Sequence, residues 1–372
     1  MQAGSDVPAA TGSSARSNLQ PQDRGTAARG WLWWTRQVRI RTQTGAPLVY
    51  SRAQEGRRPC YLSVLTRLFG ARRAGLRELL LSSAPVLFLM VEEAFLAYVV
   101  LGLLRALAGR RTVGLLLRPM PLSASPHLSR RWKRAVLGWL KRFRAIHTLT
   151  ILPFSVFPAV SAVAKGWIYD FQLWDLTDEE REAVELLRSE RPAGERQVLT
   201  AIGTQNRRKG FDLFTDSYVR LAALRTRFQF ISCGRVEPMV EAYAEAFVEA
   251  GGVVVNRCVS DAELLGVYAA SDAVWCFYPP LGDHASGVLG RAAQLGIPVV
   301  VRYGSVAHRL CIVENIPHVP TTADGLAERL TGPLPPRDEA CGRLAAARFA
   351  RQSEATLRAA LGLANLDPPA SP

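Results

Sequence analysis

The residues best suited to chemistry stand in a turn that follows an apolar, strand-like run. Arg207, Arg208 and Lys209 occupy consecutive positions in the turn 203–210, directly after the run 198–202. Three adjacent cations can neutralise a diphosphate, and the glycines that bound the turn allow the backbone to approach a ligand closely. The turn is therefore a candidate anion site, although a basic loop of this kind is also compatible with simple solvation.

A second candidate anion site lies where a helix is expected to begin, over 287–295. Ser286 and Gly287 precede its apolar positions, and Gly296 and Pro298 end it. The first amide groups of such a helix have no partner within the helix, and the helix dipole adds positive potential there. Phosphate is favoured at this point. An ordinary helix packed on a sheet is the alternative interpretation.

Both sites belong to a regular alternation of strands and helices in the second half of the chain. The expected strands are 198–202, 228–233, 253–259, 273–277 and 299–302. The expected helices between them are 212–225, 237–250, 261–270 and 287–295. Alternating elements of this length predict a parallel, doubly wound sheet, whose ligands bind beyond the carboxyl ends of the strands. Both candidate anion sites would lie at that edge.

The first half is predicted to form another domain of the same type. Its apolar block 85–107 is long enough to suggest a membrane span, but it contains Glu92, Glu93 and Arg105. Each charge costs roughly 2.5–3.5 kcal/mol at bilayer depth, which argues against a span. The preferred elements are a strand over 86–91, a helix over 92–108 with both glutamates in its first turn, and strands over 112–117 and 146–154.

Length and composition agree with a two-domain protein. The chain has 372 residues, of which 48% are hydrophobic and 21% charged, enough for two substantial cores. The expected segments are a disordered leader over 1–28, an N-terminal Rossmann-like domain over 29–176, a linker over 177–196, a C-terminal nucleotide-binding domain over 197–335, and a C-terminal helix and tail over 336–372. The six cysteines are scattered without metal-binding spacing, and no signal-peptide pattern occurs, so a cytoplasmic protein with reduced cysteines is expected.

The positive net charge of the chain, +14, comes entirely from its first half. Residues 1–165 hold 25 Lys or Arg against 6 Asp or Glu, whereas residues 166–372 hold 21 against 26, giving +19 and −5. Within the basic half, the segment 129–144 combines Trp132 and Trp139 on one helical face with many Lys and Arg residues. Such a helix suits the headgroup layer of an anionic membrane, and a helix packed on the core with a solvated basic face is the equal alternative. Nucleic acid is a less favoured partner, because no recognition motif accompanies the charge.

The second half resembles the retaining glycosyltransferases of family four. Their donor signature reads roughly E-G-F-G-x-x-x-x-E-A-x-A-x-G-x-P-V, and the stretch from Asp283 to Val299 follows it, with Asp283 and Arg291 at the two glutamate positions. The family turn G-R-x-x-x-x-K-G is matched by Lys209 and Gly210, while Thr204 replaces its arginine. Residues 260–264 match the helix start that lies between these motifs. The resemblance covers about 197–302.

This resemblance implies an α/β protein of the GT-B fold, in which two Rossmann-like doubly wound domains face a cleft. It implies a hexosyltransferase-like enzyme that transfers a sugar from a nucleotide-sugar donor with retention and without metal or cofactor. Together with the basic first half, the resemblance leads to the hypothesis of a cytoplasmic enzyme, peripheral on the inner membrane face, whose N-terminal domain binds a lipid-linked or polysaccharide-precursor acceptor. Asp283 and Lys209 would act in catalysis. The implied donor-binding residues are Gly203, Arg208, Lys209, Gly210, Ser286, Gly287, Val288 and Arg291.

Arg291 stands where the family has the glutamate that holds ribose or sugar hydroxyls. This departure supports a second hypothesis, that the chain is a non-catalytic GT-B-like protein that binds nucleotides or serves as a scaffold.

Overall fold

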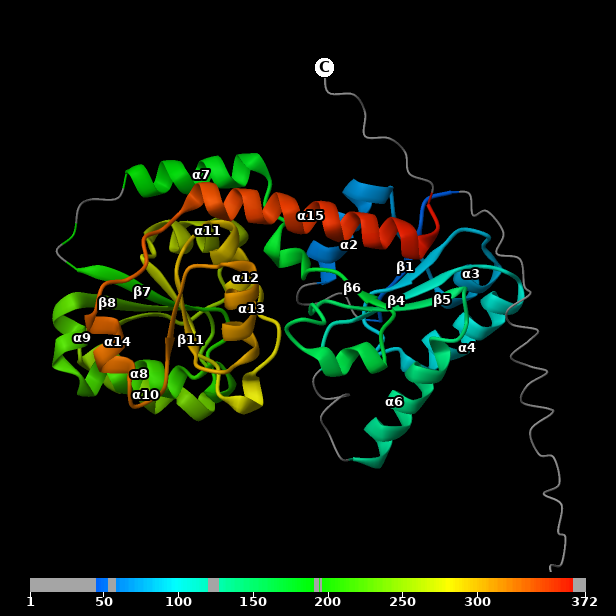
Figure 1. Ribbon diagram of the computed structural model, residues 1–372. Helices are drawn as coiled ribbons and strands as arrows, with labels where there is room; N and C mark the ends of the chain where they lie inside the picture. The colour runs from blue at the N-terminus through cyan, green and yellow to red at the C-terminus, as the bar shows by residue number, and fades with distance from the viewer. Residues whose placement is uncertain (1–44, 53–57, 120–126, 191–193, 195, 364–372) are drawn as a thin grey trace, which may run out of the picture. The chain divides into compact units, whose positions relative to one another are not determined.

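A computed structural model describes residues 45–52, 58–119, 127–190, 194 and 196–363, which form two six-stranded parallel sheets (Figure 1). The first sheet has the order β2-β1-β3-β4-β5-β6 and the second has the order β12-β11-β10-β7-β8-β9. The strands of the first sheet are β1 (Leu48–Tyr50), β2 (Arg72–Arg73), β3 (Val86–Phe88), β4 (Thr112–Leu116), β5 (Ile146–Thr150) and β6 (Gly166–Trp167). The strands of the second sheet are β7 (Gln197–Ile202), β8 (Phe228–Cys233), β9 (Val253–Val255), β10 (Ala273–Cys276), β11 (Val299–Arg302) and β12 (His318–Thr321).

Each sheet reverses its strand order at one point. In the first sheet the reversal falls between β1 and β3, and in the second it falls between β7 and β10. In a doubly wound sheet the loops after the two strands on either side of this point diverge to opposite faces and leave a crevice between them. The two reversals therefore mark the places where the topology favours a ligand.

Helices cover both faces of the first sheet. Those that precede or follow its strands are α2 (Arg58–Phe69), α3 (Leu76–Leu81), α4 (Phe95–Leu107) and α6 (Leu128–Leu140). Buried residues of α3, α4 and α6 share one core cluster on one face, whereas α2 belongs to the cluster on the other face. Gly114 of β4 allows this close packing, because a Cβ there would lie 2.6 Å from the ring of Tyr98 in α4.

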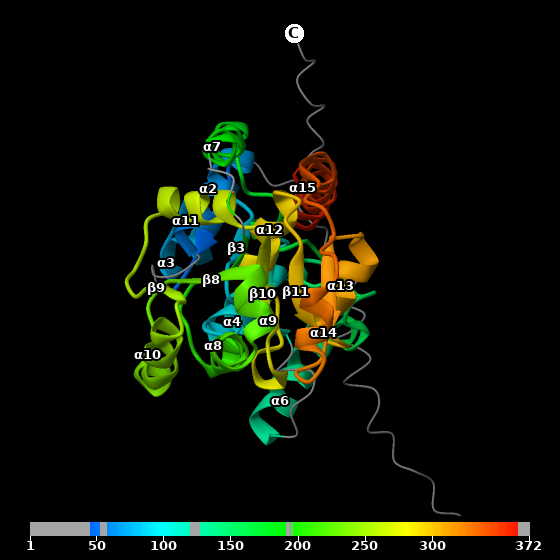
Figure 2. The ribbon, with the colours of Figure 1, turned by 90° about the vertical axis from the view of Figure 1, so that its left-hand side faces the viewer.

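The second sheet is also enclosed on both faces, as Figure 2 shows. One face is covered by α11 (Asp261–Ala270), α12 (Gly287–Gln294) and α13 (Val306–Glu314). The other face is covered by α8 (Phe211–Arg220), α9 (Ala222–Arg227), α10 (Glu241–Glu249) and α14 (Leu326–Thr331). Short 3₁₀ turns, η1 (Pro158–Ala162), η2 (Phe171–Leu173), η3 (Arg207–Lys209), η4 (Pro238–Val240) and η5 (Pro280–Gly282), join several of these elements.

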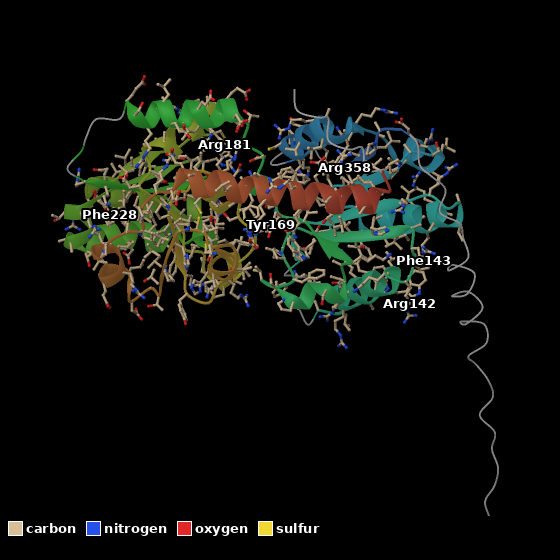
Figure 3. The ribbon with its side chains drawn as sticks, turned by 45° about the horizontal axis from the view of Figure 1, so that its top comes forward. Arg142, Phe143, Tyr169, Arg181, Phe228 and Arg358 are labelled. Atoms are coloured by element: carbon tan, nitrogen blue, oxygen red, sulfur yellow. The ribbon has the colours of Figure 1, made fainter. Side chains whose placement is uncertain are left out.

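Two further helices connect the two sheets. Helix α7 (Asp178–Ser189) begins with a capping box formed by Thr177 and Glu180, and it packs against α11. Helix α15 (Glu339–Leu361) contacts α12 near its start, and η2, β4 and β6 along its length. Tyr169, labelled in Figure 3, packs its ring 4.1 Å from that of Phe349 in α15 and donates a hydrogen bond to Glu314. Both sheets thus share one continuous core cluster.

Most of the expected elements are present, and several boundaries differ. The helix expected over 92–108 begins only at Phe95, so Glu92 and Glu93 precede it and do not occupy its first turn. Glu92 accepts a hydrogen bond from the backbone N–H of Arg118, and Glu93 forms an ion pair with Arg58. The two carboxylates are held by tertiary partners rather than by the helix dipole.

In the second half, the strand expected over 253–259 ends at Val255, because Asn256 leaves the sheet and accepts a hydrogen bond from the N–H of Val236. The helix expected over 212–225 is divided at Leu221, which has extended backbone, into α8 and α9. The capping box of Ser260 and Glu263 at the start of α11 is confirmed.

No helix within the described residues is both long and apolar enough to cross a membrane. The expected leader over 1–28 and the last residues of the expected tail, 364–372, lie outside the described residues.

Candidate functional site

The basic turn 203–210 lies at the carboxyl end of β7, beside the strand-order reversal of the second sheet. Asn206 caps the turn, because its Oδ1 accepts the N–H of Lys209 at 3.1 Å. Gly210 has a φ of +66°, and a Cβ there would lie 2.4 Å from the carbonyl oxygen of Phe277. Only glycine fits this left-handed, crowded position. The turn is therefore pressed directly against the segment that follows β10.

The same two loops touch again at Gly282, where a Cβ would lie 1.7 Å from the carbonyl oxygen of Arg208. Trp275 of β10 donates from Nε1 to the carbonyl oxygen of Lys209 at 3.3 Å. The loops after β7 and β10, which are far apart in the sequence, thus form one structure at the reversal point. These contacts join the turn to the loop that precedes the second candidate anion site at Ser286 and Gly287.

The three cations of the turn have different environments. The Lys209 ammonium is half-buried and donates to the carbonyl oxygen of Ile202 at 3.1 Å, which fixes it at the end of β7. Arg207 and Arg208 are exposed, and the Arg207 guanidinium lies 6.0 Å from the centre of the Tyr243 ring. Lys209 is therefore the cation that the fold positions most firmly.

Helix α12 begins at the expected place. Ser286 is its N-cap: its Oγ accepts the N–H of Leu289 at 3.4 Å and lies 2.8 Å from the hydroxyl of Tyr278. Gly287 is buried, and a Cβ there would lie 1.5 Å from Oε1 of Gln172 in η2. Val288 accepts a hydrogen bond from the Tyr268 hydroxyl through its carbonyl oxygen. The first turn of α12 is therefore covered on its Gly287 side by η2.

Asp283 holds the loop before α12 in place. One carboxylate oxygen accepts from the guanidinium of Arg302 and the other accepts from the N–H of Val306, at 2.8 and 2.9 Å. Burial raises the pKa of this carboxyl, while the Val306 amide and Arg302 act in the opposite direction. Asp283 thus ties the loop to β11 and to the first amide of α13.

Arg291 points from α12 toward the segment after η2. Its Nη2 donates to Oδ2 of Asp175 at 3.2 Å, and the exposed fractions of the two side chains are only 12% and 3%. Burial is the largest single effect and lowers the pKa of the guanidinium, but the opposing effects of Asp175, Tyr268 and Cys60 together raise it above its usual value. Its Nε and Nη1 are buried without a partner among the described residues. The position expected to be acidic in a family-four enzyme therefore carries half of a buried ion pair.

Sequence reasoning did not identify Asp175 or the network around it. Gln294 of α12 donates to Oδ1 of Asp175 at 2.9 Å, and Cys60 of α2 donates to Oδ2 at 3.1 Å. Arg181 of α7, labelled in Figure 3, donates two hydrogen bonds to Gln294, both at 2.8 Å. The network joins α2, α7 and α12, and no local sequence pattern relates these positions.

A cavity of about 590 Å³ opens at the carboxyl edge of the second sheet. Its lining comes from the ends of β7, β10, β11 and β12, and includes Arg207, Gly210, Leu281, Arg302 and Tyr303. A smaller cavity of about 230 Å³ lies at the reversal of the first sheet, lined by residues that include Val49, Arg58, Arg73 and Leu89. Each cavity thus lies at the edge where its sheet topology favours a ligand.

The described residues offer no grouped metal ligands, and His147 is a packed histidine. No cluster of three or more His, Cys, Asp or Glu side chains there is arranged to hold a metal ion. Burial, followed by the nearby Lys165, lowers the pKa of His147 to about 4, and this ring lies 2.9 Å from the carbonyl oxygen of Arg144. His147 is therefore a neutral, packed side chain.

No protein-family model matches the sequence, and no curated protein matches it. Solved structures do match the fold. Anabaena HepE in complex with UDP aligns with 84% of this chain and 99% of its own, at 14% identity and a TM-score of 0.56. The complex of the same protein with UDP and glucose gives the same coverage at 13% identity. Trehalose 6-phosphate synthase from Burkholderia multivorans aligns with 77% of this chain and 72% of its own, at 13% identity and a TM-score of 0.51.

The chain has the GT-B fold. Two parallel six-stranded sheets, each flanked by helices on both faces, confirm the fold predicted from the resemblance to family four.

Proposed function

We propose that this protein is a glycosyltransferase that takes a sugar from a nucleotide-sugar donor bound at the second sheet. The observation that carries the proposal is the contact between the basic turn and the loop before α12, through Gly210 and Gly282, at the reversal of strand order. In the GT-B structure of HepE the bound molecules include UDP and glucose, which supports a donor of this class. The donor diphosphate would lie beside Lys209 and Arg208.

The chemistry follows from charge. When the glycosidic bond of a nucleotide sugar breaks, the leaving nucleoside diphosphate gains negative charge. Cations and amides already fixed near that charge stabilise the transition state more than the ground state. Lys209, Arg208 and the amides near Ser286 would supply this stabilisation, without a metal ion. A carboxylate has about four lone-pair sites, so Asp283 can accept from donor hydroxyls in addition to Arg302 and Val306.

The acceptor would bind at the first sheet. The cavity at its strand-order reversal is lined by Arg73, which is exposed, and by Arg58, which is paired with Glu93; the charge of Arg73 suits an acceptor that carries phosphate. A lipid-linked or polysaccharide-precursor acceptor fits this half best, because its excess of 19 positive charges over residues 1–165 also favours an anionic membrane surface. Helix α6 would approach that surface on the cytoplasmic side, and the resemblance to family four implies retention of configuration.

The test is a panel of nucleotide sugars, with binding measured by calorimetry and turnover measured by release of nucleoside diphosphate. Lys209→Ala should weaken donor affinity at least about tenfold, which is the order expected when one charge-assisted hydrogen bond is lost. Arg220→Ala is the matched control, because Arg220 lies at the far end of α8 with 75% of its side chain exposed. A protein that binds none of the donors, or binds them equally well after Lys209→Ala, contradicts the proposed site.

The Arg291–Asp175 ion pair favours a second candidate, a GT-B protein that binds nucleotides without catalysis. In that case Arg291 replaces the acidic residue that would hold donor hydroxyls. Its ion pair with Asp175 joins α12 to the segment that follows η2. Nucleotide binding that depends on Lys209, without diphosphate release from any donor or acceptor tested, would support this candidate over the enzyme.

A further inference from the structure

The solvent face of α4 is entirely apolar. Leu96, Val100, Leu104 and Leu107 recur at helical spacing on this face, and their exposed fractions are 67%, 54%, 47% and 47%. The helix contains one charged residue, Arg105, which is 1% exposed and donates to backbone carbonyls in the core. A face without any charged group is unusual for a surface helix, because water normally lies against polar side chains there.

The neighbouring helices enlarge this apolar area. Helices α3, α4 and α6 cover the same face of the first sheet, since their buried residues form one cluster (Figure 1). Trp132 of α6 packs 5.4 Å from the ring of Phe95 at the start of α4 and is still 52% exposed. The exposed apolar residues of α3 and α6 are Leu76, Leu80, Leu81, Leu128, Trp132 and Trp139. We call these residues, together with the four exposed apolar residues of α4, the α4 face.

The orientation of α6 determines which of its apolar residues face the core and which face outward. Leu137 and Leu140 are buried against the sheet, so the core-packing side of the helix is occupied by aliphatic residues. Trp132 and Trp139 lie two turns apart on the outer side, 52% and 38% exposed. One side of the helix therefore packs on the core, and its two tryptophans are presented outward.

Positive charge borders the α4 face. Arg77 of α3, Arg131 of α6 and Arg142 just after α6 are exposed, and Lys133 lies 5.2 Å from the centre of the Phe95 ring. Neither α4 nor α6 contains an acidic residue, and Glu78 of α3 forms an ion pair with Arg72. A surface of leucine and tryptophan bordered by cations is complementary to an anionic bilayer, in which the apolar groups reach the acyl chains and the cations reach the headgroups.

We propose that the α4 face inserts into the headgroup and acyl boundary of an anionic lipid bilayer, with α4 as the inserted element and α6 at its border. This deepens the proposed function, on which it rests for the lipid-linked acceptor, by naming the surface that holds the protein on the membrane. Inserting the α4 face removes several partly exposed leucines from water, and the bordering arginines add electrostatic attraction. The helix has 13 residues and lies in the interface without crossing it.

The experiment measures binding of the full chain to vesicles by flotation. One set contains phosphatidylcholine alone, and the other contains about one third phosphatidylglycerol. The double variant Leu96→Gln/Leu104→Gln should lower the partition coefficient to anionic vesicles by roughly tenfold for each leucine. The matched control is Leu186→Gln/Leu344→Gln, which changes two leucines of α7 and α15 that are 59% and 74% exposed. The control should bind like the natural protein.

Hydroxyl-radical footprinting of Leu96, Val100 and Leu104 gives a second measurement on the unaltered full chain. We expect oxidation of these side chains in solution and protection when anionic vesicles are added. Equal flotation of both double variants overturns the proposal. Protection of the α4 face in the absence of vesicles also overturns the proposal, because another part of the chain or a second copy would then cover this face. Light scattering distinguishes these two occupants. Donor binding by calorimetry is independent of both readouts, so failure of the docking surface and failure of the proposed function are separable.

Discussion

Removing either partner of the Arg291–Asp175 pair should destabilise the fold, and the two removals should differ in magnitude. The pair is buried, and deleting one partner of a buried pair typically costs about 3–5 kcal/mol because a charge is left uncompensated. After Arg291→Met, Asp175 keeps hydrogen bonds from Gln294 and Cys60. After Asp175→Asn, the Arg291 cation loses its carboxylate while its Nε and Nη1 already lack partners among the described residues. We expect about 3 kcal/mol for Arg291→Met and about 5 kcal/mol for Asp175→Asn.

The assay is urea unfolding at pH 7, followed by tryptophan fluorescence and far-ultraviolet circular dichroism, with coincident transitions required before a free energy is derived. The double variant should lose less than the sum of the single losses, since it removes both charges together. The reasoning is refuted if Arg291→Met costs more than Asp175→Asn, or if each costs less than about 1 kcal/mol, as for a solvent-screened pair.

Three further predictions concern single residues. Gly210→Ala should lower the free energy of unfolding by at least about 1–3 kcal/mol, because Gly210 has a positive φ and lies close to the Phe277 carbonyl. Gly266→Ala, in open space within α11, should raise the free energy of unfolding by about 0.5–1 kcal/mol. Urea unfolding measures both changes. Arg105→Met should cost at least about 3 kcal/mol, since several buried carbonyls lose their donor, and a cost below 1 kcal/mol would contradict this role. Burial lowers the pKa of His147 from 6.5 to about 4, so the folded state disfavours the protonated imidazole. The free energy of unfolding should therefore fall as pH decreases from 6.5 to about 4. When unfolding is measured across that range, the His147→Gln variant should lose this part of the dependence of stability on pH.

Local patterns in the sequence were sufficient for much of the second sheet. Three elements have the expected boundaries: the strands over 228–233 and 299–302 and the helix over 261–270. Each is marked by a signal only a few residues long: an aromatic run in the first strand, a Gly-x-Pro turn before a valine-rich run in the second, and a capping box at the start of the helix. The position of the basic turn at the ligand edge was predicted for the same reason, since alternating elements determine the direction of every strand.

Features that depend on tertiary contacts were not predictable in this way. The sequence of α6 indicates a helix, but apolar residues occupy more than half of its circumference, so the sequence could not show that Leu137 faces the core and Trp139 faces outward. The ion pair of Arg291 with Asp175 joins positions 116 residues apart, and a lone aspartate in an aromatic segment carries no signal of its partner. The hydrogen bonds that hold Asp283 come from Arg302 and the first amide of α13, which follow it in the chain and left no local signal in the sequence.

The last helix has a consequence for the way the chain is made. Phe349, Leu357 and Leu361 of α15 are at most 1% exposed, and the helix contacts β4 and β6, whose residues are synthesised roughly two hundred positions earlier. Arg111, at the start of β4, donates to the carbonyl oxygen of Ala359 at 2.7 Å. The first sheet therefore emerges from the ribosome before α15 is synthesised, with one part of its core still exposed to water. That half of the protein reaches its final packing only after α15 has been synthesised.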